Sequence, residues 1–114
     1  MSEQAIQQQI RLELGRGPVR LWRNNTGALR VERGRLVRYG LCPGSSDLIG
    51  LRQLRIEEEH LGLELAVFCA LEIKAPTGRP TAEQQQFLEV IRSRGGLAGV
   101  ARSVEEARQI LQLP

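Results

Sequence analysis

The stretch LAVFCALEI, from Leu65 to Ile73, places the tightest limit on how this chain folds. Its residues are almost wholly apolar, which is typical of a central strand with both faces buried. Glu72 and Lys74 stand at its end, and the Pro/Gly loop PTGRP follows at once. Because residues i and i+2 of a strand share a face, the two charges are predicted to project together from the rim of a sheet, with Ile73 pointing into the core.

Other patterns predict a mixed α/β domain with helices flanking one central sheet. Helices are expected over residues 2–15, 81–94 and 103–113, the second with Phe87, Leu88 and Ile91 toward the core. Strands are expected within residues 19–25, 47–51 and 97–101, with a hairpin over 28–40 that turns at "RG". The predicted order is α-β-β-β-β-α-β-α, and residues 1–114 are predicted to form a single domain.

Charge is concentrated near the N-terminal end. Residues 11–38 carry eight Arg against two Glu, whereas the whole chain has a formal net charge of only +3. A basic segment of this kind predicts a polyanionic partner. The alternative is a solvated face made Arg-rich by genomic base composition.

Lys74 and Asp47 are the only Lys and the only Asp among the charged residues, which are otherwise Arg and Glu. Asp47 opens an apolar strand, and if that strand pairs with the run ending at Glu72, two carboxylates converge. Two carboxylates and a backbone carbonyl form an oxygen site suited to Mg²⁺, and a neighbouring Lys can orient or deprotonate water, which Arg cannot. The alternatives are a weak exposed ion pair between Glu72 and Lys74, and an Asp47 that caps a turn.

Several segments resemble the virus-type replication-repair nuclease (VRR-NUC) domain of the PD-(D/E)xK superfamily, in its stand-alone phage and bacterial form. They are PGSSDLIG, ALEIKAPTGRPTAEQQQFLEVIRSRGG, SEQAIQQQI and RLWRNNTG, which span nearly the whole chain except residues 52–64. The resemblance implies a restriction-endonuclease-like core. It also implies that Asp47, Glu72 and the Ile73 carbonyl bind Mg²⁺, with Mn²⁺ able to substitute, and that Lys74 serves the nucleophile. Ser46 stands where the superfamily name has a Pro before the Asp.

The same resemblance implies two further site residues. Gln84 matches a Gln on the helix after the core strand, and its alternative role is a capping box with Thr81. Glu3 matches an acid of the first helix that often completes the site. Because Glu3 lies on the stripe of Ile6 and Ile10, it is predicted to face inward; its alternative role is an acid at a helix N-terminus.

The RNNTG segment resembles the family's loop near the substrate. Asn24 and Asn25 could bind phosphates or bases, or could equally form an Asx-turn, and Trp22 is expected in the core rather than stacked on a base. The candidate DNA contacts are Arg23, Asn24, Asn25, Arg33, Arg35, Arg38 and Arg79.

These patterns predict a Mg²⁺-dependent DNA endonuclease that selects structure, because phosphate contacts carry no sequence information. Stand-alone members resemble Holliday-junction resolvases, and a two-fold junction needs two sites, so a homodimer is expected. One alternative is a catalytically inactive or accessory nucleic-acid-binding module of a phage replication or repair complex. Another is a restriction-type or repair endonuclease with sequence preference.

Nothing in the chain predicts a membrane or secreted protein. No apolar run approaches the roughly 20 residues of a membrane span, and the N-terminus lacks a signal-peptide pattern. Cys42 and Cys69 are isolated and predicted to be buried, reduced thiols. A cytoplasmic location, in a bacterial or phage-infected cell, is therefore expected.

Overall fold

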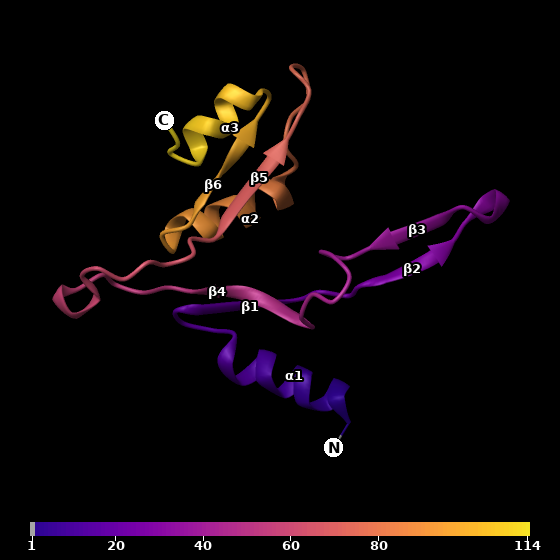
Figure 1. Ribbon diagram of the computed structural model, residues 1–114, viewed down its shortest axis with the longest axis horizontal. Coiled ribbons are helices and arrows are strands. Elements are labelled where there is room, and N and C mark those ends of the chain that lie inside the picture. The colour runs from indigo at the N-terminus through magenta and orange to yellow at the C-terminus, as the bar shows by residue number, and fades with distance from the viewer. Residues whose placement is uncertain (1) are drawn as a thin grey trace. The chain divides into compact units, whose positions relative to one another are not determined.

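The computed structural model describes residues 2–114 and contains two compact units, Met1–Leu54 and Arg55–Pro114 (Figure 1). The helices are α1 (Glu3–Leu14), α2 (Ala82–Ser93) and α3 (Val104–Ile110). The strands are β1 (Val19–Arg23), β2 (Gly27–Arg30), β3 (Leu36–Tyr39), β4 (Leu48–Arg52), β5 (Cys69–Ile73) and β6 (Leu97–Ala101). Two 3₁₀ turns, η1 (Glu32–Gly34) and η2 (Glu58–His60), complete the order. The hairpin supplies two strands, so five strands precede α2, one more than predicted.

The first unit begins with α1, whose ends are capped as the sequence predicts. The Ser2 side chain accepts a hydrogen bond from the Ala5 N–H at 3.1 Å, and the Gly15 N–H donates to the Arg11 carbonyl at 3.0 Å. The helix turns an amide-rich side toward β1 and leaves its apolar stripe uncovered within the unit, with Ile6 44% exposed. The prediction that Glu3 faces inward is therefore wrong, because that stripe is exposed and Glu3 with it.

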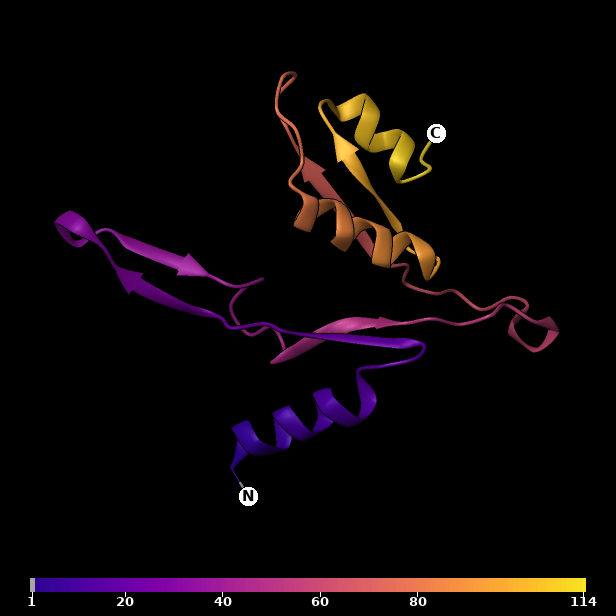
Figure 2. The same cartoon turned by 180° about the vertical axis from the view of Figure 1, so that it is seen from behind.

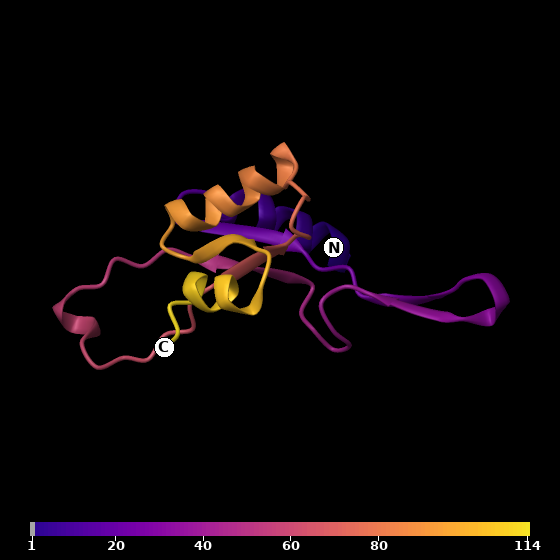
Figure 3. The same ribbon diagram turned by 90° about the horizontal axis from the view of Figure 1, so that it is seen from above.

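The strands of the first unit form two antiparallel pairs. β1 pairs with β4, from Val19 opposite Arg52 to Arg23 opposite Leu48. β2 pairs with β3, and Figure 3 shows this hairpin as a ribbon extending from the end of β1. Its turn lies at "RG" as predicted, where Arg33 and Gly34 have φ of 63° and 71°. A left-handed φ favours glycine, so the conformation of the turn explains why position 34 is occupied by Gly.

The second unit is built on a parallel pair, β5 and β6, connected through α2. Figure 2 shows α2 lying across both strands, and α3 packs mainly against β6. The buried apolar side chains are Leu88, Ile91, Ala98 and Ala101. Leu88 and Ile91 face the core as predicted, whereas Phe87 is 39% exposed, so the prediction for that residue is wrong.

The long apolar run differs from its prediction. Only Cys69–Ile73 forms strand β5, whereas Leu65 and Val67 precede it and lie about half exposed. Ile73 is 66% exposed and not in the core. The reason is that α2 covers one face of β5 while α3 packs mainly on the neighbouring strand β6.

Three two-stranded sheets are present among residues 2–114: β1–β4, β2–β3 and β5–β6. The mixed α/β class is thus confirmed, while a single central sheet and a single domain stay predictions. Both cysteines are free, as predicted, but exposed rather than buried. No helix in the described part of the chain is both long and apolar enough to cross a membrane.

Candidate functional site

Glu72 and Lys74 meet at the end of β5, as strand alternation predicts. The distance from Lys74 Nζ to Glu72 Oε1 is 3.4 Å, and the two side chains are 22% and 28% exposed. The Lys74 backbone is also held, because its N–H donates to the Ala101 carbonyl at 3.1 Å and continues the β5–β6 pairing by one residue. The pair is therefore fixed in position yet open to solvent, as a site that must admit a substrate requires.

Glu72 and Gln84 line the same open cavity, of about 340 Å³, between β5 and α2. Gln84 also forms the predicted capping box. Its Oε1 accepts from the Thr81 N–H at 2.9 Å, while the Thr81 hydroxyl accepts from the Gln84 N–H at 3.1 Å. One amide oxygen thus caps α2, and the amide nitrogen takes no part in the cap. The capping role and a site role for Gln84 are consequently compatible.

Phe87 lines this cavity too, and the sequence had placed it in the core. An aromatic residue three positions after Gln84 lies on the same side of a helix, so the spacing could have indicated the neighbourhood. The Ile73 carbonyl, implied as a metal ligand, belongs to the residue between Glu72 and Lys74. Its role stays a prediction.

Asp47 is exposed and directly precedes β4, in the first unit. Its carbonyl accepts a hydrogen bond from the Asn24 N–H at 2.8 Å, which ties it to the end of β1. Asp47 and the Glu72–Lys74 pair lie in different units, so their convergence stays a prediction. Among residues 2–114, no group of three or more His, Cys, Asp or Glu side chains gathers that could hold a metal ion.

Asn24 holds the loop that leads to Asp47. Its amide nitrogen donates to Ser45 Oγ at 2.6 Å and to the Ser46 carbonyl at 3.0 Å, and its Oδ1 accepts from the Leu41 N–H at 3.0 Å. With the side chain engaged at both ends, the geometry favours loop organisation over a direct DNA contact for this residue.

Asn25 differs from Asn24. It is exposed, and its Oδ1 accepts from Arg23 Nη2 at 3.2 Å, so its amide nitrogen remains available for a DNA contact. Trp22, on the preceding strand, is half-buried.

The predicted hairpin contacts Arg33, Arg35 and Arg38 are all exposed, as is Arg79 in the loop after β5. None of these four side chains takes part in the ion pairs found within residues 2–114. Their charge is therefore not neutralised by a protein carboxylate, which is what an electrostatic contact with phosphates requires.

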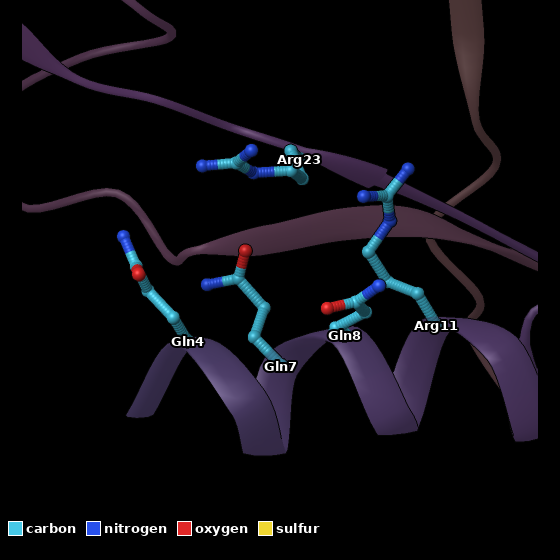
Figure 4. A pocket seen from close by; sticks show the side chains of 5 residues that line it. All are labelled: Gln4, Gln7, Gln8, Arg11 and Arg23. Atoms are coloured by element: carbon cyan, nitrogen blue, oxygen red, sulfur yellow. The ribbon is translucent and has the colours of Figure 1, made fainter. Parts of the chain in front are cut away.

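One basic surface was missed by sequence reasoning. Gln4, Gln7, Gln8 and Arg11 on α1 line an open cavity together with Arg23 of β1 (Figure 4). The helical spacing of these polar residues, beside the apolar stripe, is the signal that could have identified it.

A search of curated proteins and a search of solved structures found no match to this chain. A scan against protein-family models matched the VRR-NUC domain over residues 1–105. Nearly the whole sequence is covered, including every site residue discussed above. A nuclease-type function and nucleic-acid binding follow from that match. The chain therefore belongs to the VRR-NUC domain family.

Proposed function

We propose that this protein is a Mg²⁺-dependent endonuclease that hydrolyses phosphodiester bonds of branched DNA. The observation that carries the proposal is the Glu72–Lys74 pair, with 3.4 Å between Lys74 Nζ and Glu72 Oε1. Glu72 of this pair also lines a cavity with Gln84. A carboxylate and a compact ammonium at the exposed end of a strand suit phosphodiester hydrolysis. Family membership supports the same reaction class.

The donor atoms fit a hard cation. The Glu72 carboxylate is partly open to solvent, Asp47 is exposed, and the Ile73 carbonyl is the third oxygen of the proposed set. These three residues would hold Mg²⁺, and Mn²⁺ should substitute for it. When bound, the ion would polarise a phosphoryl oxygen and lower the pKa of a coordinated water.

Lys74 orients the attacking water in this proposal. Its ammonium has three rotatable donors and can share or release a proton, whereas the guanidinium of Arg stays protonated and is wider. Gln84 can donate from its amide nitrogen to a phosphate oxygen while its oxygen caps α2. Glu3 is proposed as an outer acid that completes the site, and its exposure leaves it accessible for that role.

The proposal also requires a single sheet. The PD-(D/E)xK core that the family suggests is proposed for this chain, and Asp47 and Glu72 are proposed to share one metal ion in it. A branched junction has two-fold symmetry and one chain supplies one site, so the active form is proposed to be a homodimer.

The decisive experiment incubates the protein with labelled four-way junction, flap and linear duplex DNA, with Mg²⁺ or EDTA. We expect cutting of branched substrates only with Mg²⁺, and a dimer mass by light scattering. Binding without cutting in Mg²⁺ would instead favour a nucleic-acid-binding module. Cutting of linear duplex at one sequence would favour a restriction-type enzyme.

Calorimetric titration of Mg²⁺ tests the shared site without relying on activity. If Asp47 and Glu72 hold one ion, Asp47→Asn and Glu72→Gln should each abolish the same binding event, and the double variant should lose nothing more. Glu89→Gln is a matched control, because Glu89 is an exposed carboxylate on α2 that pairs with Arg92. Independent, additive losses would show that the two carboxylates do not share an ion.

A further inference from the structure

The cavity between α1 and the end of β1 has an unusually uniform lining. Its volume is about 320 Å³, and all of its lining residues carry side-chain N–H donors: Gln4, Gln7, Gln8, Arg11 and Arg23. Figure 4 shows the α1 side chains extending toward the strand that carries Arg23. Residues 4, 7, 8 and 11 recur at helical spacing, so this donor-rich face is a continuous feature of α1. Each Gln also carries a carbonyl acceptor, but the two guanidinium groups carry donors alone, so donors outnumber acceptors and favour a ligand rich in acceptors.

The charge in this cavity is uncompensated. No carboxylate lines it, and the ion pairs found within residues 2–114 include neither Arg11 nor Arg23. Arg23 donates to Asn25 Oδ1 at 3.2 Å, but that acceptor is uncharged and satisfies only one of five guanidinium N–H groups. Glu13, on the same helix, accepts a hydrogen bond from Gln9 and does not line the cavity. The preferred ligand is therefore an anion.

The geometry of the donors favours a phosphate over a carboxylate. A carboxylate is planar and is satisfied by one bidentate guanidinium, whereas a phosphate presents oxygens in several directions and can engage two guanidinium groups and neighbouring amides at once. Two Arg from different elements, with three carboxamides between them, match that requirement. The cavity is also open, so a phosphate that belongs to a longer chain could enter it.

The position of Arg23 connects this cavity to the strand end that carries Asp47. Arg23 is the last residue of β1 and lies opposite Leu48, and the next residue, Asn24, donates from its backbone to the Asp47 carbonyl at 2.8 Å. Asp47 does not line the cavity, but it is hydrogen-bonded to the residue that follows Arg23. The cavity and Asp47 therefore lie at the same end of β1.

We propose that the cavity formed by α1 and Arg23 binds a backbone phosphodiester of the nucleic acid. This inference rests on the proposed function for its biological context. It adds a phosphate contact on α1 to the hairpin arginines. The ligand chemistry is a phosphate group, which could also come from a free phosphate compound, so the test has an arm for each source.

The first arm measures binding of a fluorescein-labelled DNA duplex by anisotropy in EDTA, across a series of NaCl concentrations. Arg11→Gln and Arg23→Gln should each lower the slope of log K against log[salt] by about 1, and weaken binding about 5–10-fold at ~0.1 M salt. Arg11→Lys should keep the slope because it keeps the charge. Arg16→Gln is the matched control, an exposed Arg of the same unit that does not line the cavity. Unchanged slopes for both variants would overturn the proposal.

The second arm titrates isotope-labelled protein with inorganic phosphate at constant ionic strength and follows the side-chain resonances of Gln7 and Arg11. Shifts in these resonances, together with the altered DNA slopes, support the proposal. Phosphate-induced shifts with unchanged DNA slopes would assign the cavity to a free phosphate compound and overturn the nucleic-acid assignment. Both arms exclude Mg²⁺ and therefore measure binding alone. If the separate cleavage experiment with Mg²⁺ showed no cutting, the nuclease proposal would fail, whereas this binding proposal would still be decided by the two arms.

Discussion

The two units of this chain divide burial and charge between them. The buried apolar side chains found within residues 2–114 all lie in the second unit, on α2 and β6. Residues 1–54 carry nine Arg against three Glu and one Asp, a net +5, whereas residues 55–114 carry a net −2. The first unit therefore offers basic surface with little core, and the second offers a packed frame that fixes the Glu72–Lys74 pair.

This division follows from two different physical requirements. The proposed catalytic pair, Glu72 and Lys74, must be held within a narrow range of positions, and apolar burial around α2 and β6 would supply that rigidity. Polyanion binding needs exposed, unpaired positive charge, which is incompatible with deep burial. We therefore expect changes in the α2–β6 core to affect stability, changes at Lys74 to affect chemistry, and changes at the exposed arginines of the first unit to affect binding.

Lys74→Arg should have the largest effect. It keeps the positive charge but removes the compact ammonium, so single-turnover cleavage of a junction with Mg²⁺ should fall by about 10²–10⁴-fold with DNA affinity unchanged. The control is Arg16→Lys in the first unit, the reverse exchange at an exposed position, which should be neutral. Wild-type cutting by Lys74→Arg would mean that the single lysine has no chemical role.

The second-largest effect is expected when Arg33, Arg35 and Arg38 are changed together to Gln. Losing three phosphate contacts should lower the salt slope by about 3 and weaken DNA binding by about 10²–10³-fold at ~0.1 M salt, for all sequences alike. Arg92→Gln with Arg108→Gln is the control, since both are arginines of the second unit paired with carboxylates. If the control weakens binding more than the hairpin variant, the division of charge does not describe the DNA surface.

The substitutions Ile91→Ala and Ile10→Ala compare how much an apolar side chain in each unit contributes to the free energy of unfolding. Ile91 is 0% exposed on α2, and its truncation should cost about 2–5 kcal/mol in urea unfolding, because it leaves a cavity in a packed core. Ile10 is 37% exposed on α1, so the same truncation should cost less than about 1 kcal/mol. Equal losses would show that the α1 stripe is covered in the folded protein.

The smallest effect is expected from comparing Asn24→Asp with Asn25→Asp by their free energies of unfolding. Aspartate at position 24 cannot donate to Ser45 Oγ and the Ser46 carbonyl, so unfolding free energy should fall by about 1–3 kcal/mol, and the Leu41 amide should exchange faster. Aspartate at position 25 keeps the acceptor for Arg23 and should be close to neutral in stability. Equal effects at the two positions would contradict the loop-holding role of Asn24.

Local features of the fold were predictable from the sequence because they depend on neighbouring residues. The caps at Ser2 and Thr81, the "RG" hairpin turn and the shared face of Glu72 and Lys74 each involve groups no more than a few positions apart. Backbone geometry alone relates such groups. The VRR-NUC family was also recognisable from motifs that are contiguous in the chain.

Burial was predicted less well, because it depends on which elements pack together. Ile73 and the stripe of α1 look like core residues by pattern, yet α3 packs mainly on β6 and α1 turns its Gln side toward β1. The Asn24 clamp on the loop before Asp47 and the cavity at Arg11 and Arg23 likewise join residues from separate segments. The sequence by itself determined the local elements, the family and the candidate chemistry. Only the tertiary structure decided which faces are covered and which polar groups meet, because those contacts depend on the three-dimensional packing of distant segments.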